Sequence, residues 1–132
     1  MRRIIAAILI FVPAAGVLGQ SDTVKLRITP LTGDFYIYTT YNSYEGDRLP
    51  ANGMYLVTKE GVVLYDTPWD TTQFQPLLDT IWSRHQKDVV LCMATHWHSD
   101  RTEGLAYYRQ KGIKTYTTVM TVLDRLAKKG LV

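Results

Sequence analysis

Apolar and polar residues alternate with a period of two along the first half of the chain. Residues 24–28 alternate apolar and basic side chains, and residues 35–40 are rich in aromatic and β-branched types. Two further runs, residues 52–58 and 61–66, meet at Lys59-Glu60-Gly61, which is the pattern of a β-hairpin. The sequence therefore predicts four strands of an antiparallel or mixed sheet, with a polar loop over residues 42–50.

The period becomes helical after residue 70. Apolar residues recur at i, i+3, i+4, i+7 and i+8, which is one face of an amphipathic helix: Phe74, Leu77, Leu78, Ile81 and Trp82. We expect Asp70, Thr71 or Thr72 to cap this helix. Pro76 has no N–H to donate, so the regular helix is expected to start, or to kink, near Gln75.

Strand and helix patterns alternate through the second half. Residues 88–94 are an almost unbroken apolar run, which is typical of a strand covered on both faces. Residues 102–110 and 119–129 are helical in pattern, and residues 113–117 form a short strand between them. This alternation predicts an α/β fold in which helices cover one face of a mixed sheet. Residues 131–132 fit the opening of a further strand.

Residues 1–19 have the pattern of a secretory signal peptide. Arg2 and Arg3 precede an apolar stretch over residues 4–12, and small residues lead to a cleavage position after Gly19. The stretch is too short to cross a bilayer, so an uncleaved anchor is the weaker alternative. We therefore expect export to the periplasm, a mature domain over residues 20–132, and no stable membrane association after cleavage.

Charge and cysteine content narrow the choice of partners. The chain of 132 residues has fifteen basic and twelve acidic side chains, and loss of residues 1–19 removes two of the basic ones. A mature chain near neutrality, without a basic stripe, argues against a nucleic-acid partner. The single cysteine, Cys92, cannot form an intramolecular disulfide and is expected to be a small buried apolar residue.

Metal-ligating residues follow the apolar run of residues 88–94. His96, His98 and Asp100 are spaced two apart, so in an extended or tightly turned backbone they converge on one volume. Two imidazoles and a carboxylate suit Zn²⁺. Three ligands do not close a tetrahedral site, and we do not expect the remaining candidates, His85 and Cys92, to complete it.

The segment His96-Trp97-His98-Ser99-Asp100-Arg101 resembles the His-x-His-x-Asp signature of the metallo-β-lactamase superfamily. Residues 52–57, 61–69, 94–96 and 111–116 resemble the class B β-lactamases themselves. Arg101 stands where many relatives have His, and His96 stands where the mono-zinc subclass has Asn. The resemblance is therefore to the broad-spectrum di-zinc subclass in its flavobacterial form, and it implies the first half of an αβ/βα sandwich.

The resemblance implies a role for each matching residue. His96 and His98 match ligands of one zinc ion, and Asp100, the expected catalytic residue, matches a ligand of a second. Arg101 matches a supporting position near the second zinc, and Asp66 matches an aspartate behind the ligand loop. The alternative for Asp66 is an N-terminal cap of the segment that follows it. Residues 41–50 match a mobile hairpin loop that closes over the substrate, and this loop contains Tyr41 and Tyr44.

The activity implied by the resemblance is hydrolysis of the β-lactam amide bond by a monomeric enzyme that confers antibiotic resistance, with water activated by zinc. The family is nearly twice as long as this chain, and its other ligands lie in a second half. We therefore expect a fragment that is inactive alone. One alternative is a catalytically dead remnant that binds metal weakly. Another is a thioesterase or other ester hydrolase of the same fold, against which Arg101 and the signal peptide argue.

Overall fold

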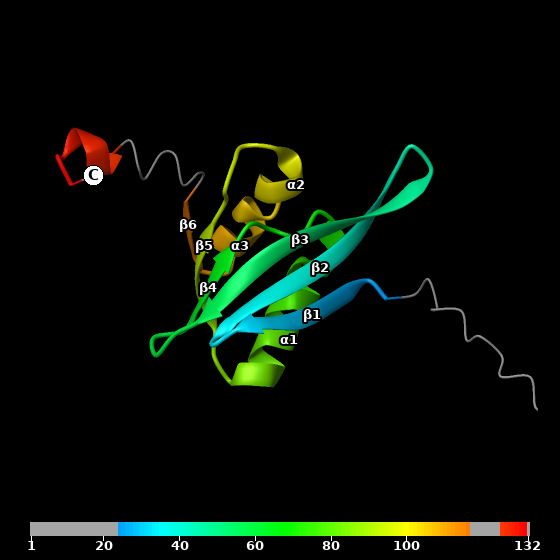
Figure 1. The fold of residues 1–132 in the computed structure, drawn as a ribbon, viewed down its shortest axis with the longest axis horizontal. Helices are drawn as coiled ribbons and strands as arrows, with labels where there is room; N and C mark the ends of the chain where they lie inside the picture. The colour runs from blue at the N-terminus through cyan, green and yellow to red at the C-terminus, as the bar shows by residue number, and fades with distance from the viewer. Residues whose placement is uncertain (1–23, 117–124, 132) are drawn as a thin grey trace, which may run out of the picture.

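A six-stranded mixed sheet forms the body of the computed structural model, which describes residues 24–116 and 125–131 (Figure 1). The strands lie in chain order across the sheet: β1 (Leu26–Thr32), β2 (Phe35–Tyr44), β3 (Asp47–Val57), β4 (Val62–Tyr65), β5 (Val89–Met93) and β6 (Lys114–Tyr116). β1 to β4 pair antiparallel, whereas β5 pairs parallel to β4 and β6 parallel to β5. Parallel neighbours need crossover connections, and helices supply them here. The predicted mixed α/β sheet is confirmed.

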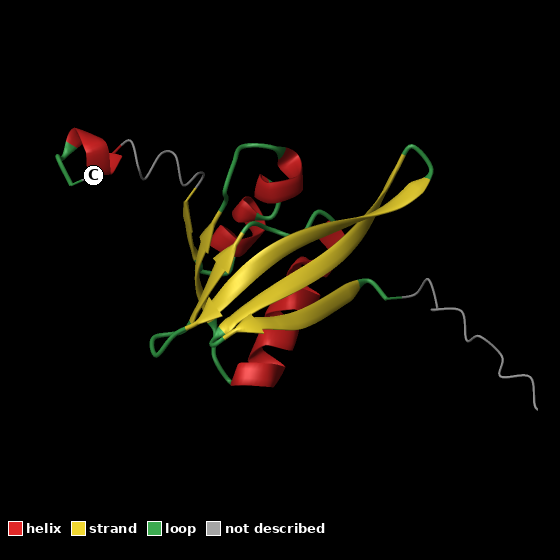
Figure 2. Ribbon diagram, viewed as in Figure 1, coloured by secondary structure: helices red, strands yellow, loops and turns green. Residues whose placement is uncertain are grey.

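Helices connect the parallel strands and pack on one face of the sheet. The short η1 (Thr71–Gln73) and α1 (Phe74–His85) link β4 to β5, and α2 (Ser99–Thr102) and α3 (Leu105–Gln110) link β5 to β6. Leu77 and Ile81 of α1 are buried in the same cluster as Tyr108 of α3 and Leu64 of β4. Figure 2 shows α1 crossing behind β1 to β3, so the core lies between the sheet and these helices.

The start of α1 and one of its apolar residues differ from the sequence prediction. Asp70 Oδ1 accepts a hydrogen bond of 2.9 Å from the backbone N–H of Thr72, so Asp70 caps the short η1 that precedes α1, whereas α1 begins after Gln73 without a side-chain cap. Pro76 lies in the first turn of α1, where an N–H has no partner within the helix. Trp82 was expected on the buried face and is 48% exposed, so that prediction is wrong. It lies about 80° around the helix from Phe74, at the edge of the apolar stripe.

The polar segment expected as a loop, residues 42–50, is the end of a paired hairpin. Tyr44 of β2 pairs with Asp47 of β3, so the ladder continues to a two-residue turn. In this turn Glu45 and Gly46 have φ values of 51° and 89°, which suit a tight hairpin. β4 pairs only with the other end of β3, so Pro50 lies on a stretch that has a neighbouring strand on one side alone, where proline is tolerated.

The sheet face opposite α1 is not covered by any element of the described chain. Figure 2 shows β1 to β3 with nothing in front of them. Apolar residues on this face, such as Met54, Leu91 and Met93, are half-buried, whereas Cys92 on the helix side is fully buried. The expectation that residues 88–94 are covered on both faces is therefore wrong within the described residues.

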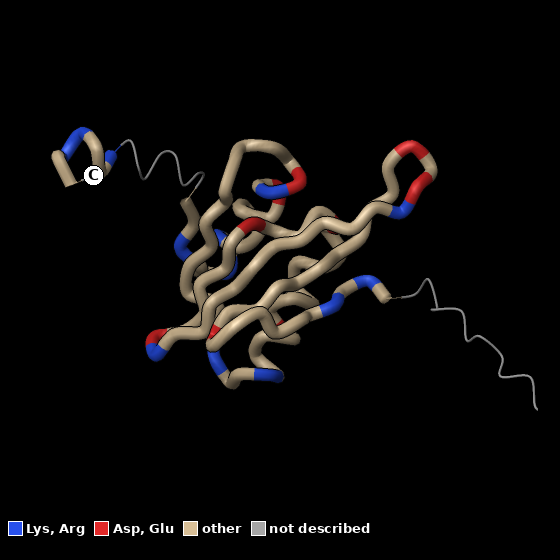
Figure 3. The backbone as a smooth tube through the Cα atoms, in the orientation of Figure 1, with Lys and Arg blue, Asp and Glu red and all other residues tan. Residues whose placement is uncertain are grey.

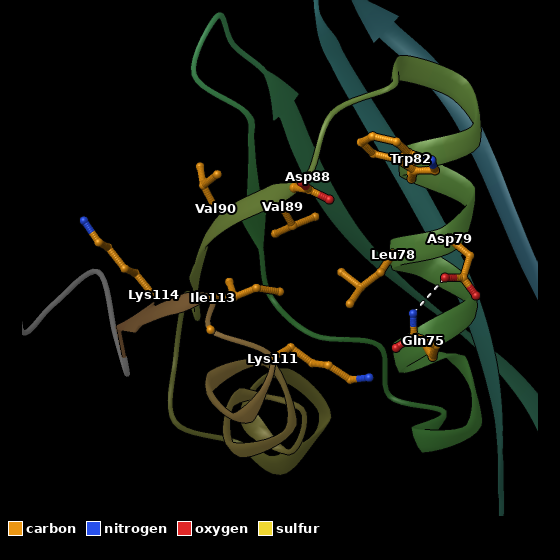
Figure 4. A pocket seen from close by; sticks show the side chains of 11 residues that line it. Gln75, Leu78, Asp79, Trp82, Asp88, Val89, Val90, Lys111, Ile113 and Lys114 are labelled. Carbon is orange, nitrogen blue, oxygen red and sulfur yellow. Dashed lines mark hydrogen bonds between the residues drawn. The ribbon is translucent and has the colours of Figure 1, made fainter.

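A groove of about 680 Å³ lies on the helix side, between α1 and the start of β5 (Figure 4). Leu78 and Trp82 line it from α1, and Val89 and Ile113 line it from the sheet side. It shares no residue with the His96, His98 and Asp100 cluster. The groove is therefore not part of the candidate metal site.

Two predictions fall partly or wholly outside the described residues. The signal peptide over residues 1–19 is outside them, as are residues 117–124 of the expected last helix and strand; residues 125–128 are helical. Among the described helices, none has the length and apolar character needed to cross a bilayer.

Candidate metal centre

The three expected ligands come together just beyond the end of β5. The chain leaves β5 at Met93 and turns through residues 94–98 into α2, whose first turn carries Asp100. One ligand atom each from His96, His98 and Asp100 lies within 4.8 Å of the others. His96 Nε2 is 3.9 Å from Asp100 Oδ1, and the two imidazole centroids are 4.9 Å apart.

A short helical turn fixes Asp100 relative to the histidines. The His98 carbonyl accepts hydrogen bonds from the backbone N–H groups of Arg101 and Thr102, at 3.0 and 3.1 Å. The Thr102 hydroxyl donates to the same carbonyl at 3.0 Å. These bonds close the single turn of α2 and fix the position of Asp100 relative to His98.

Asp66 holds the ligand loop from behind. Its side chain is buried, and Oδ1 accepts hydrogen bonds from Thr95 N at 2.7 Å and from Thr95 Oγ1 at 2.9 Å. Thr95 Oγ1 is in turn 3.1 Å from His96 Nδ1, which leaves His96 Nε2 directed toward Asp100. The φ of Asp66 is 65°, a left-handed conformation that costs a non-glycine residue roughly 1 kcal/mol.

Arg101 connects the two carboxylates around the cluster. Its Nε lies 3.0 Å from Asp100 Oδ2, and its Nη1 lies 3.8 Å from Asp66 Oδ2. Arg101 Nη1 also donates to the Asn52 carbonyl of β3. Its Nε is buried without a hydrogen-bond partner in the described chain, so the contact with Asp100 is an ion pair and not a directed hydrogen bond. Since Arg101 engages Oδ2, Asp100 Oδ1 remains on the side of His96.

The donor set fits zinc. Zinc binds nitrogen and oxygen at about 2.0–2.2 Å, which places neighbouring tetrahedral ligands about 3.4 Å apart. The ligand atoms here, up to 4.8 Å apart, are more widely spaced. The side chains of His96 and Asp100 are 42% and 31% exposed, so rotations of partly free side chains can close the difference. The cluster is open to solvent and leaves room for further ligands.

The two spare candidates lie elsewhere. His85 Nε2 is 3.0 Å from the Tyr55 hydroxyl, and burial, together with Arg84, lowers the pKa of His85. Cys92 is fully buried in β5, where burial raises the pKa of its thiol to about 12. Neither belongs to the metal-ligating group found among the described residues.

Tyr41 and Tyr44 lie in β2, in the paired part of the hairpin and not in the irregular polar loop that the composition of residues 42–50 predicted. The ladder with β3 includes both residues because the tight turn at Glu45 lets pairing continue to the tip. The guanidinium of Arg48 stacks on the Tyr41 ring, 3.9 Å from its centroid, and Tyr44 is 56% exposed. A role for either tyrosine toward substrate stays a prediction.

Sequence reasoning missed two residues that shape the site. Asn52 receives the hydrogen bond of Arg101 across 49 positions of sequence, which no local pattern reveals. A Cβ at Gly104 would lie 2.9 Å from both Thr67 Cβ and Phe74 Cε1, so only glycine lets α3 approach there. The one available signal was a glycine inside the segment expected to be helical, residues 102–110, and in the structure Gly104 lies between α2 and α3.

Sequence comparison relates the chain to metallo-β-lactamases. It is 45% identical over 100 residues to the metallo-β-lactamase type 2 of Elizabethkingia meningoseptica, and 49% identical over 92 residues to the metallo-β-lactamase IND-1 of Chryseobacterium indologenes. The matches cover 76% and 70% of this chain but only 40% and 38% of those proteins. The chain thus spans about two fifths of the length of these relatives. No family model matches it.

Solved structures agree with the sequence relatives. The crystal structure of the metallo-β-lactamase IND-7 matches with a TM-score of 0.68 and 46% identity, over 80% of this chain and 48% of that one. A metallo-β-lactamase from Pontibacter korlensis matches with a TM-score of 0.67 and 31% identity over the same shares. By sequence and by fold, this chain is homologous to part of the flavobacterial class B metallo-β-lactamases, about two fifths of their length in the sequence matches and about half in the structural match.

Proposed function

We propose that the chain forms part of a zinc-dependent hydrolase of the di-zinc subclass that opens the amide bond of β-lactam antibiotics. One observation carries this proposal: His96, His98 and Asp100 meet within 4.8 Å in a chain that is 45% identical to a protein named metallo-β-lactamase. In this proposal the two histidines hold one zinc ion, and Asp100 holds a second next to the reacting amide. Bound zinc supplies Lewis-acid polarisation of a carbonyl and activation of water near neutral pH.

The surrounding residues support these assignments by leaving one donor atom of each of two ligands free. Thr95 Oγ1 lies 3.1 Å from His96 Nδ1, so Nε2 is the nitrogen available to metal. Arg101 Nε lies 3.0 Å from Asp100 Oδ2, so Oδ1 is the available oxygen. The proposed task of Asp66, Thr95 and Arg101 is to hold the ligands in these orientations, as outer partners of metal ligands do.

The proposal includes export to the periplasm, with residues 1–19 removed, and a monomeric protein that acts on small molecules. The signal-like pattern of Arg2, Arg3 and the apolar residues 4–12 supports export. Figure 3 shows basic positions interspersed with acidic ones along the described backbone, which supports the absence of a nucleic-acid partner.

Metal binding without turnover is the second candidate, and the openness of the site favours it for the chain by itself. A catalytic zinc ion is usually held by three protein ligands and keeps one open position. The described residues supply three such ligands in one group, too few for two ions. We therefore expect the 132-residue chain to bind zinc weakly and to hydrolyse no β-lactam.

Zinc binding by the full chain, compared with its His96→Ala variant, tests the proposed site. We expect X-ray absorption of the zinc-loaded chain to show imidazole and oxygen ligands without sulfur. The variant should lose more than the roughly 100-fold in affinity that follows loss of a residue merely supporting a ligand. Equal affinity of the two proteins, or a sulfur ligand from Cys92, would contradict the assignment. A chromogenic cephalosporin added to both proteins should be turned over at the same background rate.

Export is tested by the mass of the secreted chain, which should equal that of a chain beginning at Gln20.

A further inference from the structure

Trp97 stands between the two histidines of the cluster and is 75% exposed. Its indole centroid lies 4.2 Å from that of the His98 imidazole, with the ring planes tilted by 59°. The His96 imidazole meets the same ring edge-on, at 4.9 Å and 88°. The His98 ring is therefore in contact with the aromatic rings of the two residues that precede it in the sequence.

The two histidines are supported in different ways. His96 Nδ1 lies 3.1 Å from Thr95 Oγ1, which is itself bonded to Asp66. Metal-binding histidines usually have such a polar partner, which fixes the orientation of the ring. Within the described chain no hydrogen bond reaches the His98 ring, and its ring contacts are His96 and Trp97.

The backbone beneath Trp97 is held in place. The Thr102 hydroxyl lies 3.3 Å from the Trp97 carbonyl and 3.0 Å from the His98 carbonyl, so the two carbonyls share its single proton. An indole attached to a fixed backbone restricts the rotation of a ring packed against it. Tilted aromatic rings in contact, such as the Trp97 indole and the His98 imidazole, are also mutually attractive.

We propose that Trp97 is a positioning residue for His98: its indole holds the imidazole toward the cluster, in place of the hydrogen bond that His96 has. This inference rests on the proposed function, because it takes the cluster to be a metal site. It accounts for a large exposed indole between two ligands, where it contributes little to the core. Removal of Trp97 should leave the fold intact and weaken metal binding about tenfold, the lower limit for loss of a residue that orients a ligand.

The test uses the full chain with three substitutions: Trp97→Ala, Trp97→Phe and, as a matched control, Trp82→Ala. Trp82 is also a partly exposed tryptophan, but it lies at the groove beside α1 and away from the cluster. We expect the Trp97→Ala chain to bind Zn²⁺ about tenfold more weakly in competition with a chromogenic chelator. The Trp97→Phe chain, which keeps a ring, and the Trp82→Ala chain should stay within about twofold of the unaltered protein.

A second readout is independent of metal. In NMR spectra of the metal-free chain, nuclear Overhauser effects should join the Trp97 indole to the His98 ring protons.

Absence of these effects overturns the inference. Two results of the zinc competition also overturn it: a Trp97→Ala chain that binds Zn²⁺ as tightly as the unaltered one, or a Trp97→Phe chain that loses as much Zn²⁺ affinity as Trp97→Ala. If the effects are present but the unaltered chain binds Zn²⁺ no better than His96→Ala, the proposed metal site is wrong and the positioning role is overturned with it.

Discussion

At the scale of single residues, the Asp66 side chain joins two segments that are far apart in the sequence. It is a buried carboxylate in a left-handed backbone conformation, with φ of 65°, which few residues other than glycine, asparagine and aspartate tolerate. The strain is offset by two hydrogen bonds from Thr95 and by the nearby Arg101 guanidinium. Asp66 thereby couples the end of β4 to the loop that presents His96.

Substitution of Asp66 should therefore cost stability in proportion to the contacts that are lost. Asp66→Ala leaves the Thr95 N–H without its acceptor and puts alanine in a left-handed conformation, so we expect a loss of about 2–4 kcal/mol in urea unfolding. Asp66→Asn keeps both an acceptor and tolerance of positive φ, and should lose about 1 kcal/mol. Glu103→Ala, an exposed neighbour of α2, is the control and should stay within about 0.5 kcal/mol. An Asp66→Ala chain as stable as this control would show that Asp66 does not hold the loop.

At the scale of elements, local patterns predicted most of the fold and failed where a neighbour decided the outcome. β4, α1 and β5 follow from period and composition, and the Asp70 cap follows from residue type. The hairpin tip was missed because glycine and proline normally mark loops, whereas Pro50 is tolerated on a stretch of β3 that pairs on one side only. The exposure of Trp82 depends on how far α1 is rotated against the sheet, which periodicity leaves open.

β5 lies inside the sheet, between β4 and β6, and its buried cysteine should be unreactive in the folded chain. Burial raises the pKa of the Cys92 thiol to about 12, so the folded chain should resist iodoacetamide at pH 8 and react only in denaturant. Mass spectrometry of the alkylated chain measures this, and rapid labelling without denaturant would contradict it.

The same burial makes stability depend on alkaline pH. Because the pKa of the Cys92 thiol in the folded chain lies above its unfolded value of 9.0, the unfolded chain loses this proton at a lower pH than the folded chain does. The contribution of Cys92 to stability is therefore complete below pH 9 and declines as pH rises toward 12. A Cys92→Val chain should lose this part of the alkaline decline.

At the scale of the whole molecule, the site depends on contacts between distant parts of the chain. The sequence motif was enough to predict that His96, His98 and Asp100 converge, because their spacing is local. The supports are not local: Arg101 reaches Asn52 in β3, and Thr95 reaches Asp66 at the end of β4. Only the sheet order brings these residues together, and without the family resemblance neither Asp66 nor Arg101 could have been selected.

The chain also matches about half of its structural relatives, and the sheet face opposite α1 carries half-buried apolar residues without a covering element in the described chain. The most direct test of function therefore joins this chain to the remaining part of a relative. The central claim is that this chain contributes working zinc ligands to a β-lactam hydrolase. A chimera in which it replaces the matching segment of the Elizabethkingia protein puts its ligands in that setting.

The measurement is the zinc-dependent rate at which this chimera hydrolyses a chromogenic cephalosporin. We predict turnover that a chelator abolishes and zinc restores, and a loss of more than about 100-fold on His96→Ala substitution, beyond what loss of a supporting residue causes. A Glu103→Ala chimera should match the unaltered one. A folded, zinc-loaded chimera without turnover, or one whose turnover survives His96→Ala, would contradict the proposed function.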